Sequence, residues 1–370
     1  MSDQWKAARL GDVICFQRGF DLPARLRQSG GIPIVSSSGI SDFHSRAKVA
    51  APVVVTGRYG TIGEVFYVNE YCWPLNTTLF VVDFKGNHPP FVYYILKTID
   101  FKSYSGKSGV PGVNRNDLHE IAVSCPPLDE QKLIASALSD IDELLASLDA
   151  LIAKKHDLKQ AAMQQLLTGR VRSPGFQGES AYKHTEAGVV PSDWVVSYIE
   201  EIATISTGGK NTQDRVDGGE FPFFVRSQKV ESINSYSFDG EAVLTAGDGV
   251  GTGRIFHYIN GKFDAHQRVY LITDFGSHVD GYWFYLYFSV NFYNRLIQMT
   301  AKSSVDSIRR EMIARMPIAL PPTKAEQTAI ATILSDMDSE ITALEARRDK
   351  TRALKQGMMQ ELLSGRIRLL

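Results

Sequence analysis

The sequence predicts an α+β fold in which two mixed α/β domains are separated by two long helices that pair as an antiparallel coiled coil. Three observations lead to this prediction: a strong internal repeat, apolar residues at helical spacing in both copies, and a strand, glycine turn, strand pattern ahead of each copy. The predicted segments are a first domain at 1–127, a central helix at 128–172, a linker at 173–192, a second domain at 193–322 and a C-terminal helix at 323–370. The repeat gives this order a pseudo-twofold character.

The repeat aligns residues 130–172 with residues 326–368 at a constant offset of 196, and 21 of the 43 aligned positions are identical. Each copy opens on Glu-Gln shortly after a double proline, at 126–127 and 321–322. Each closes on Leu-Leu-Thr/Ser-Gly-Arg-x-Arg. Such identity at one offset predicts that the two segments adopt the same structure.

Both copies are predicted to be helices. The prolines disfavour helix before them, and Glu130 and Glu326 place negative charge in the first helical turn, where the helix dipole favours it. Gly169 and Gly365 can take the left-handed conformation that ends a helix. Apolar residues recur at three- and four-residue steps at Ile134, Ala137, Leu138, Ile141, Leu144, Leu145, Leu148, Leu151 and Ile152, and again at Ile330, Ile333, Leu334, Met337, Ile341 and Leu344.

The length of these helices predicts how they pair. A helix of about 40 residues is roughly 60 Å long and needs a partner along its length, and the other copy can bury both apolar stripes at once. A linker of roughly 20 residues can fold back beside one helix end, whereas parallel pairing would make it run the length of a helix. We therefore expect antiparallel pairing, with the domains at opposite ends and related by a pseudo-twofold axis.

The segments ahead of the helices share a weaker pattern. Trp5 and Trp194 each precede apolar residues, and strand, glycine turn, strand patterns follow at 53–67 and 242–256. The glycine clusters at 57–63 and 247–253 lie inside these patterns. Residues 173–192 are rich in Gly, Ser and Pro without an apolar period, which predicts a linker.

Composition narrows the function. The 370 residues carry a net charge of -1, with +3 over 1–127 and -4 over 173–322, so any nucleic-acid binding must depend on local positive charge. No apolar run of about 20 residues and no charged-then-apolar leader is present, which predicts a cytoplasmic, non-membrane protein. Cys15, Cys72 and Cys125 lack the spacing of disulfide or zinc sites, so we expect no metal.

The motifs typical of enzymes are missing from the sequence. His88 precedes Pro-Pro-Phe where amino-methyltransferases carry Asp or Asn, so a loop leading into a helix is expected there. The glycine clusters are predicted to join two strands, whereas nucleotide-binding loops lead from a strand to a helix. No Walker lysine, paired metal-ligand histidines or nucleophile elbow occurs, so no catalytic residue is predicted.

Polar loop residues suit the binding of DNA, because Arg, Lys, Asn, Gln and Ser bond base edges and phosphates. The alternative is that each is a solvated surface residue, but they recur in matching places of both domains. In the first domain they are Ser36, Ser37, Ser38, His44, Arg46, Arg58, Tyr59, Lys107, Ser108, Asn114, Arg115 and Asn116. In the second they are Arg226, Gln228, Lys229, Lys302, Ser303, Ser304, Arg309 and Arg310.

Over nearly its whole length the chain resembles the specificity subunit of type I restriction-modification enzymes. The resemblance rests on the tandem arrangement, the Pro-Pro to Glu-Gln helix starts, the Leu-Leu-Thr/Ser-Gly-Arg-x-Arg ends and Gly-x-Val-Pro-Ser-Asp-Trp at 188–194. It is strong in the helices and weak in the domains. The second helix start has one more residue between the prolines and Glu-Gln than the first, a departure that shifts a turn.

The resemblance implies two target-recognition domains that read double-stranded DNA, two methyltransferase subunits bound along the helices, and restriction motor-nuclease subunits in the full complex. S-adenosylmethionine and ATP would then bind those partners, so no cofactor is expected on this chain. We expect Leu145, Ile152 and Met358 to offer apolar flanks to a partner. The two domains differ in sequence, which predicts a bipartite, asymmetric target.

Other functions stay open at this point. A related methylation-only system would differ only in its partners. A helical scaffold whose domains bind protein or peptide would share the helix periodicity, and sequence-selective DNA binding would separate it. A stand-alone methyltransferase is disfavoured by the missing catalytic and cofactor motifs.

Overall fold

The computed structural model describes residues 5–105, 112–176, 181–299 and 307–369. Its contacts divide the chain into two compact units. Unit 1 comprises Met1–Leu151 and Leu344–Leu370, and unit 2 comprises Ile152–Ala343. Each long helix belongs partly to one unit and partly to the other, because the division falls after Leu151 in the first helix and after Ala343 in the second. The predicted boundaries of the five segments stay a prediction.

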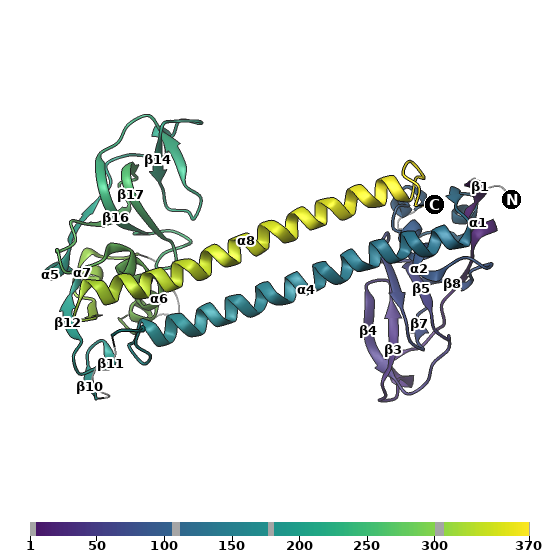
Figure 1. Ribbon diagram of the computed structural model, residues 1–370, viewed down its shortest axis with the longest axis horizontal. Helices are drawn as coiled ribbons and strands as arrows, with labels where there is room; N and C mark the ends of the chain where they lie inside the picture. The colour runs from purple at the N-terminus through teal and green to yellow at the C-terminus, as the bar shows by residue number, and fades with distance from the viewer. Residues whose placement is uncertain (1–4, 106–111, 177–180, 300–306, 370) are drawn as a thin grey trace. The chain divides into compact units, whose positions relative to one another are not determined.

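The domain of unit 1 contains a four-stranded sheet in the order β2-β8-β5-β6, a three-stranded sheet in the order β4-β3-β7, and the antiparallel pair β1-β9 (Figure 1). Its strands are β1 (Lys6–Arg9), β2 (Cys15–Arg18), β3 (Ile32–Ser36), β4 (Gly39–His44), β5 (Val53–Gly57), β6 (Val65–Val68), β7 (Trp73–Pro74), β8 (Thr78–Asp83) and β9 (Ala122–Cys125). Its helices are α1 (Leu10–Val13), α2 (Pro89–Leu96) and α3 (Arg115–His119), with 3₁₀ turns η1 (Ala24–Leu26) and η2 (Phe101–Tyr104).

The domain of unit 2 contains a six-stranded sheet in the order β13-β18-β16-β17-β14-β15 and the antiparallel pairs β12-β19 and β10-β11. Its strands are β10 (Tyr182–Thr185), β11 (Gly188–Pro191), β12 (Val195–Tyr198), β13 (Thr204–Thr207), β14 (Phe221–Phe224), β15 (Glu231–Ile233), β16 (Phe238–Ala246), β17 (Phe256–Ala265), β18 (Val269–Thr273) and β19 (Pro317–Leu320). Its helices are α5 (Ile199–Ile202), α6 (Gly281–Met299) and α7 (Arg310–Ala314), with the 3₁₀ turn η3 (Thr212–Asp214).

The two domains repeat the same strand pairing. The order β2-β8-β5-β6 in unit 1 corresponds to β13-β18-β16-β17 in unit 2, and the pair β1-β9 corresponds to β12-β19. Successive side chains of a central strand bury themselves in different cores: Val54 and Val243 join one cluster of each unit, and Val53 and Leu244 join another. The internal repeat therefore extends through the domains, as the strand patterns predicted.

The two long helices are α4 (Leu128–Leu166) and α8 (Lys324–Leu362), each of 39 residues. In unit 1, Lys355 bonds Asp142, and Arg348 lies 3.8 Å from Asp149. In unit 2, the Nζ atoms of Lys155 and Lys159 lie 2.6 Å and 2.5 Å from carboxylate oxygens of Glu340 and Asp338. Within each unit residue numbers rise along one helix as they fall along the other, so the predicted antiparallel pairing is confirmed.

The predicted ends of both helices are also confirmed. Gly169 and Gly365 have φ of +67° and +73°, and the amide of the residue two positions later bonds back into the last helical turn. A Cβ at Gly169 would lie 2.5 Å from the Pro191 ring. These glycines are needed both for the backbone conformation and for the close packing of the chain behind them.

The segment predicted as a linker contains regular structure. Strands β10 and β11 form an antiparallel hairpin with Tyr182 opposite Pro191, and Val190 is buried in the main core of unit 2. The sequence predicted a linker because Gly, Ser and Pro are typical of turns. The hairpin forms because Val190 packs against core residues that are distant in the sequence.

Two buried carboxylates tie the start of each long helix to the end of the other. Glu130 is fully buried and accepts hydrogen bonds of 2.7 Å from Nε and Nη2 of Arg368. Glu326 is 1% exposed and accepts bonds of 2.6 Å and 2.8 Å from Nε and Nη2 of Arg172. We call these pairs clasp 1 and clasp 2. They explain why the repeat begins with Glu and ends with Arg, a relation that the sequence analysis missed.

The glutamines that follow these carboxylates hold the next helix of each domain. Oε1 of Gln131 accepts a 2.8 Å bond from the amide of His88, at the start of α2. Oε1 of Gln327 accepts a 2.8 Å bond from the amide of Asp280, at the start of α6. The predicted role of His88 as a loop residue before a helix is confirmed.

Clasp 1 predicts a loss of stability in acid. Burial disfavours the charged form of Glu130, but the hydrogen bonds from Arg368, Leu369 and Trp5 outweigh it and hold the pKa of the carboxyl below its usual value. The stabilisation should be complete above the unfolded pKa and should disappear as pH falls through the lowered folded pKa. Urea unfolding of wild type and Glu130→Gln between about pH 7 and about pH 3 should give a stability difference that shrinks with acid. A constant difference would contradict this assignment.

Candidate DNA interface

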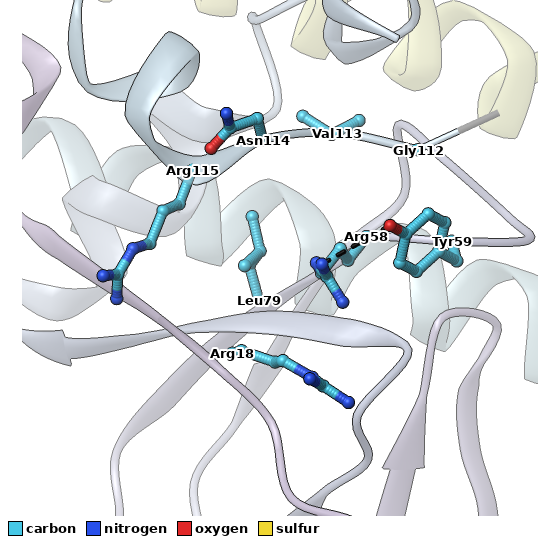
Figure 2. A pocket seen from close by; sticks show the side chains of 8 residues that line it. All are labelled: Arg18, Arg58, Tyr59, Leu79, Gly112, Val113, Asn114 and Arg115. Atoms are coloured by element: carbon cyan, nitrogen blue, oxygen red, sulfur yellow. Dashed lines mark hydrogen bonds between the residues drawn. The ribbon is translucent and has the colours of Figure 1, made fainter. Parts of the chain in front are cut away.

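A polar cavity opens beside the glycine turn of unit 1 and has a volume of about 580 Å³. Figure 2 shows the side chains that line it, which come from the ends of β2 and β5, from β8 and from the start of α3. Its lining residues are Arg18, Arg58, Tyr59, Leu79, Gly112, Val113, Asn114 and Arg115. Three of these carry guanidinium groups and none carries a carboxylate, so the cavity is suited to an electronegative ligand.

The glycine turn that carries Arg58 and Tyr59 lies between two strands, as predicted. It follows β5 and precedes β6, and Gly60 and Gly63 have φ of +80° and +99°. A Cβ at Gly60 would lie 3.1 Å from the hydroxyl of Ser37, so the serine turn at 36–38 lies next to the glycine turn. The structure thus brings together two of the polar segments that the sequence analysis singled out.

Two predicted residues near the serine turn differ in exposure. Arg46 is exposed. His44 is 4% exposed, its Nδ1 lies 3.0 Å from the amide of Gln28, and its ring meets the Trp73 ring edge-on at 5.3 Å. The predicted DNA-binding role of His44 does not fit this burial, because its ring is in contact with Gln28 and Trp73 and is not open to a ligand.

The second polar segment of unit 1 starts α3. The Asn114 side chain accepts a 3.0 Å bond from the amide of Asn116 and thereby caps this helix. Arg115 and Asn116 are exposed beside the cavity. Lys107 and Ser108, also predicted here, lie outside the described residues.

The corresponding glycine turn of unit 2 has a carboxylate near its tip. Asp248 is 2.8 Å from Nη1 of Arg226 and 2.5 Å from Nη1 of Arg268. The hydrogen bond from Arg226 opposes the effect of burial and, with that from Arg268, lowers the pKa of Asp248. The carboxylate in the turn of unit 2 therefore holds two arginines from other segments, whereas the turn of unit 1 carries its arginine, Arg58, itself.

The remaining predicted residues of unit 2 lie on its surface where they are described. Gln228 is exposed, and Lys229 pairs with Glu231 at 3.3 Å. Arg309 and Arg310 are exposed at the start of α7. Lys302, Ser303 and Ser304 lie outside the part of the chain that the structure describes.

Three arginines near these turns were missed by the sequence analysis. Arg18 ends β2 and lines the cavity of unit 1. Arg268 holds Asp248, and Arg254 lies over the Tyr293 ring at 4.3 Å and bonds its hydroxyl at 2.6 Å. Arg254 directly follows the glycine cluster, so its position in the sequence could have identified it, whereas Arg18 and Arg268 reach the turns only through strand pairing.

Exposure along α4 corrects the predicted partner surface. Ile152 is 6% exposed and Leu145 is half-buried, while Met358 packs on a core cluster of unit 1. Leu144, Leu151 and Leu158 are instead exposed, at 39%, 39% and 47%, as are Leu128 and Leu133 nearer the start of the helix. One helical residue corresponds to a rotation of about 100°, so Leu144 and Leu151 lie on a different face of α4 from the half-buried Leu145 and the buried Ile152.

Comparison with known proteins identifies the family. The model of the type I restriction modification DNA specificity domain matches residues 2–154 and again residues 191–352, which together make up most of the chain. The chain belongs to this family. Its double match agrees with the two repeated domains, and the function of this type I specificity protein is that of a DNA sequence-recognition subunit.

Relatives and solved structures support this assignment. The type I restriction enzyme MjaVIII specificity subunit of Methanocaldococcus jannaschii is 25% identical over 99% of this chain and 94% of its own length. The EcoDI specificity subunit of Escherichia coli is 30% identical over 48% of this chain and 38% of its own length. The crystal structure of the S subunit from M. genitalium shares the fold with a TM-score of 0.69 at 13% identity, covering 98% of this chain and 96% of that one.

Among the described residues, no group of three or more His, Cys, Asp or Glu side chains is arranged to hold a metal ion. Within the same residues, no helix is both long enough and apolar enough to cross a membrane.

Proposed function

We propose that this specificity protein binds a bipartite, asymmetric site in double-stranded DNA, with one half-site for each domain. The observation that carries this proposal is the difference between the two glycine turns: Arg58 and Tyr59 in unit 1 stand where unit 2 has Gly247 and Asp248. Equivalent turns that place different side chains, and hold their arginines differently, suit different base edges. Two half-sites of different sequence follow.

We further propose that the chain catalyses nothing itself and positions two methyltransferase subunits, with restriction motor-nuclease subunits in the full complex. S-adenosylmethionine and ATP would bind those partners. The glycine turns support this division, because each joins two strands and lacks the following helix whose amide groups would hold phosphate. A related methylation-only system would use this chain in the same way with fewer partners.

The exposed leucines of α4 supply a test of partner binding. Leu144 and Leu151 are exposed at the same seven-residue spacing that a partner helix uses. Leu144→Asp with Leu151→Asp should weaken copurification of the methyltransferase subunits and leave the melting temperature of the chain nearly unchanged. The matched pair Leu145→Asp with Ile152→Asp should instead lower the melting temperature, because these side chains are buried or half-buried. Unchanged copurification with the first pair would contradict this partner surface.

Methylome sequencing tests the proposed function itself. A host that expresses this chain with its methyltransferase subunits should carry modified adenines in one bipartite, non-palindromic sequence. The chain alone and the methyltransferase alone should leave no such mark. Modification at a palindrome, or modification by the chain alone, would contradict the proposal.

A further inference from the structure

We infer that Arg58 selects a guanine in the half-site of the first domain, and that Tyr59 and Gly112 hold its guanidinium in position to do so. This inference rests on the proposed function, because it requires that the domain of unit 1 contacts base edges. Guanine presents two acceptors, O6 and N7, in the major groove, and a guanidinium can donate to both at once.

The backbone beneath Arg58 is fixed from two sides. The amides of Arg58 and Tyr59 donate to the carbonyl of Thr77 at 2.8 Å and 3.1 Å, and the carbonyl of Arg58 accepts a 2.9 Å bond from the amide of Val113. The turn is therefore tied both to the residues before β8 and to those before α3. A fixed backbone reduces the conformational entropy that Arg58 would lose on binding.

The side chain of Arg58 is oriented by its neighbour. Its guanidinium carbon lies 4.4 Å from the centre of the Tyr59 ring, and its Nη2 is 3.4 Å from the Tyr59 hydroxyl. Gly112 makes this placement possible, because a Cβ there would lie 2.2 Å from the Tyr59 ring. Figure 2 shows Arg58 beside the Tyr59 ring, with Arg18 nearby. Arg58 is thus oriented by Tyr59 while it lines the cavity.

The charge around Arg58 favours guanine over adenine and cytosine. Arg18 and Arg115 line the same cavity, and no lining residue is acidic. The ion pair of Arg18 with Asp21 is long, at 3.7 Å, and both side chains are more than half exposed. A site rich in donors attracts O6 and N7 of guanine, whereas adenine and cytosine present amino groups that such a site cannot accept.

The second domain supplies an internal comparison. At the corresponding turn, the backbone carbonyl of Gly247 accepts the bond from Ile308 that Arg58 accepts from Val113. Gly247 has no side chain to donate, and Asp248 replaces Tyr59 with an acceptor. A contact from the position of Arg58 therefore cannot form in the second domain, where the guanidinium groups near the turn are those of Arg226 and Arg268, both paired with Asp248.

The experiment measures binding by the assembled complex of the chain with its methyltransferase subunits. Wild type is first selected against duplexes with randomised half-sites, which defines the guanine positions. Arg58→Ala should lower the selectivity for guanine at one position by about 5- to 150-fold, because it removes the donor to O6 and N7. Arg58→Lys should lower it less, because an ammonium can still donate but lacks the planar fork that Tyr59 orients. Arg58→Lys keeps the charge, so the salt dependence of its binding should match wild type. Gly112→Ala keeps the guanidinium but displaces Tyr59, so it should lower the selectivity for guanine at the same base position.

A modified base tests whether Arg58 contacts N7 of the guanine. Placing 7-deazaguanine at that position removes N7, which should weaken wild type and leave Arg58→Ala unaffected. Arg25→Ala, an exposed arginine of the same unit that does not line the cavity, is the matched control and should keep the guanine preference. Melting of each variant checks its folding.

Three outcomes would overturn the inference. If Arg58→Ala weakens all sequences alike and flattens the salt dependence, Arg58 binds a phosphate. If 7-deazaguanine leaves wild-type binding unchanged at every guanine of both half-sites, no arginine contacts N7. If wild type selects a bipartite site and the Arg58 variants select the same one, the inference fails while the proposed function stands, whereas wild type without any selectivity would refute both.

Discussion

Replacing Glu326 with alanine should destabilise unit 2 by about 3 kcal/mol, because it leaves Arg172 without its main partner in a nearly dry site. Glu326 is 1% exposed and the Arg172 side chain 14% exposed. Arg172 keeps two bonds of 3.0 Å to Asp193, which limits the loss to the lower end of the range for broken buried pairs. For a unit of about 190 residues, such a loss should lower the melting temperature by roughly 6–12 °C.

The same helix offers a matched control. Glu340 pairs with Lys155 at 2.6 Å, but the two side chains are 50% and 27% exposed. Glu340→Ala should therefore cost less than about 1 kcal/mol. Urea unfolding of the full chain measures both variants, and hydrogen exchange should show Glu326→Ala opening residues 324–334. If both substitutions lower the free energy of unfolding equally, burial does not determine how much these two ion pairs stabilise the protein.

Removing one facing heptad from each long helix should shorten the preferred DNA spacer by about 3 base pairs, because seven residues of helix span about 10.5 Å and a base pair about 3.4 Å. Asp142 faces Lys355 and Asp149 faces Arg348, and the residue numbers of each pair add to 497. Residues 146–152 therefore face 345–351, and joint deletion keeps the register of the remaining pairs. On a target with the original spacer, specific affinity should fall about 1000-fold or more, towards non-specific binding.

The control deletes only 345–351, which leaves an unpaired heptad and should lower the melting temperature. In the joint deletion the two half-sites should stay the same, since Arg58 and Asp248 lie far along the chain from the removed segments. Binding selections with randomised half-sites and spacers measure both properties. Altered half-sites with an unchanged spacer would reverse the roles that we propose for the domains and the helices.

Some features of this protein were predictable because they depend on local physical chemistry. The apolar period and the double prolines located both helices, and Gly169 and Gly365 marked their ends because only glycine takes positive φ at little cost. The antiparallel pairing followed from the length of the linker. The glycine turns were placed between strands by the pattern around them.

Other features could not be predicted because they join residues far apart in the sequence. His44 was chosen as a polar loop residue, and only the pairing of β3 with β4 and the position of Trp73 show that it is buried. Ile152 was expected to offer an apolar flank to a partner, yet it is buried in the folded chain. Arg18 and Arg268 were missed because strand order, not sequence proximity, brings them to the turns.

Neighbouring residues encode the tandem repeat of domain and helix and the motifs of a DNA specificity subunit, because repeats, helix periods and helix ends are local features of a chain. Which charged side chains are buried and which line a cavity depends on the folded chain. Glu130 and Arg58 are both ordinary charged residues in the sequence. The chain folds the first against Arg368 and holds the second at an open cavity, because desolvation and hydrogen bonding depend on residues that meet only in the folded protein.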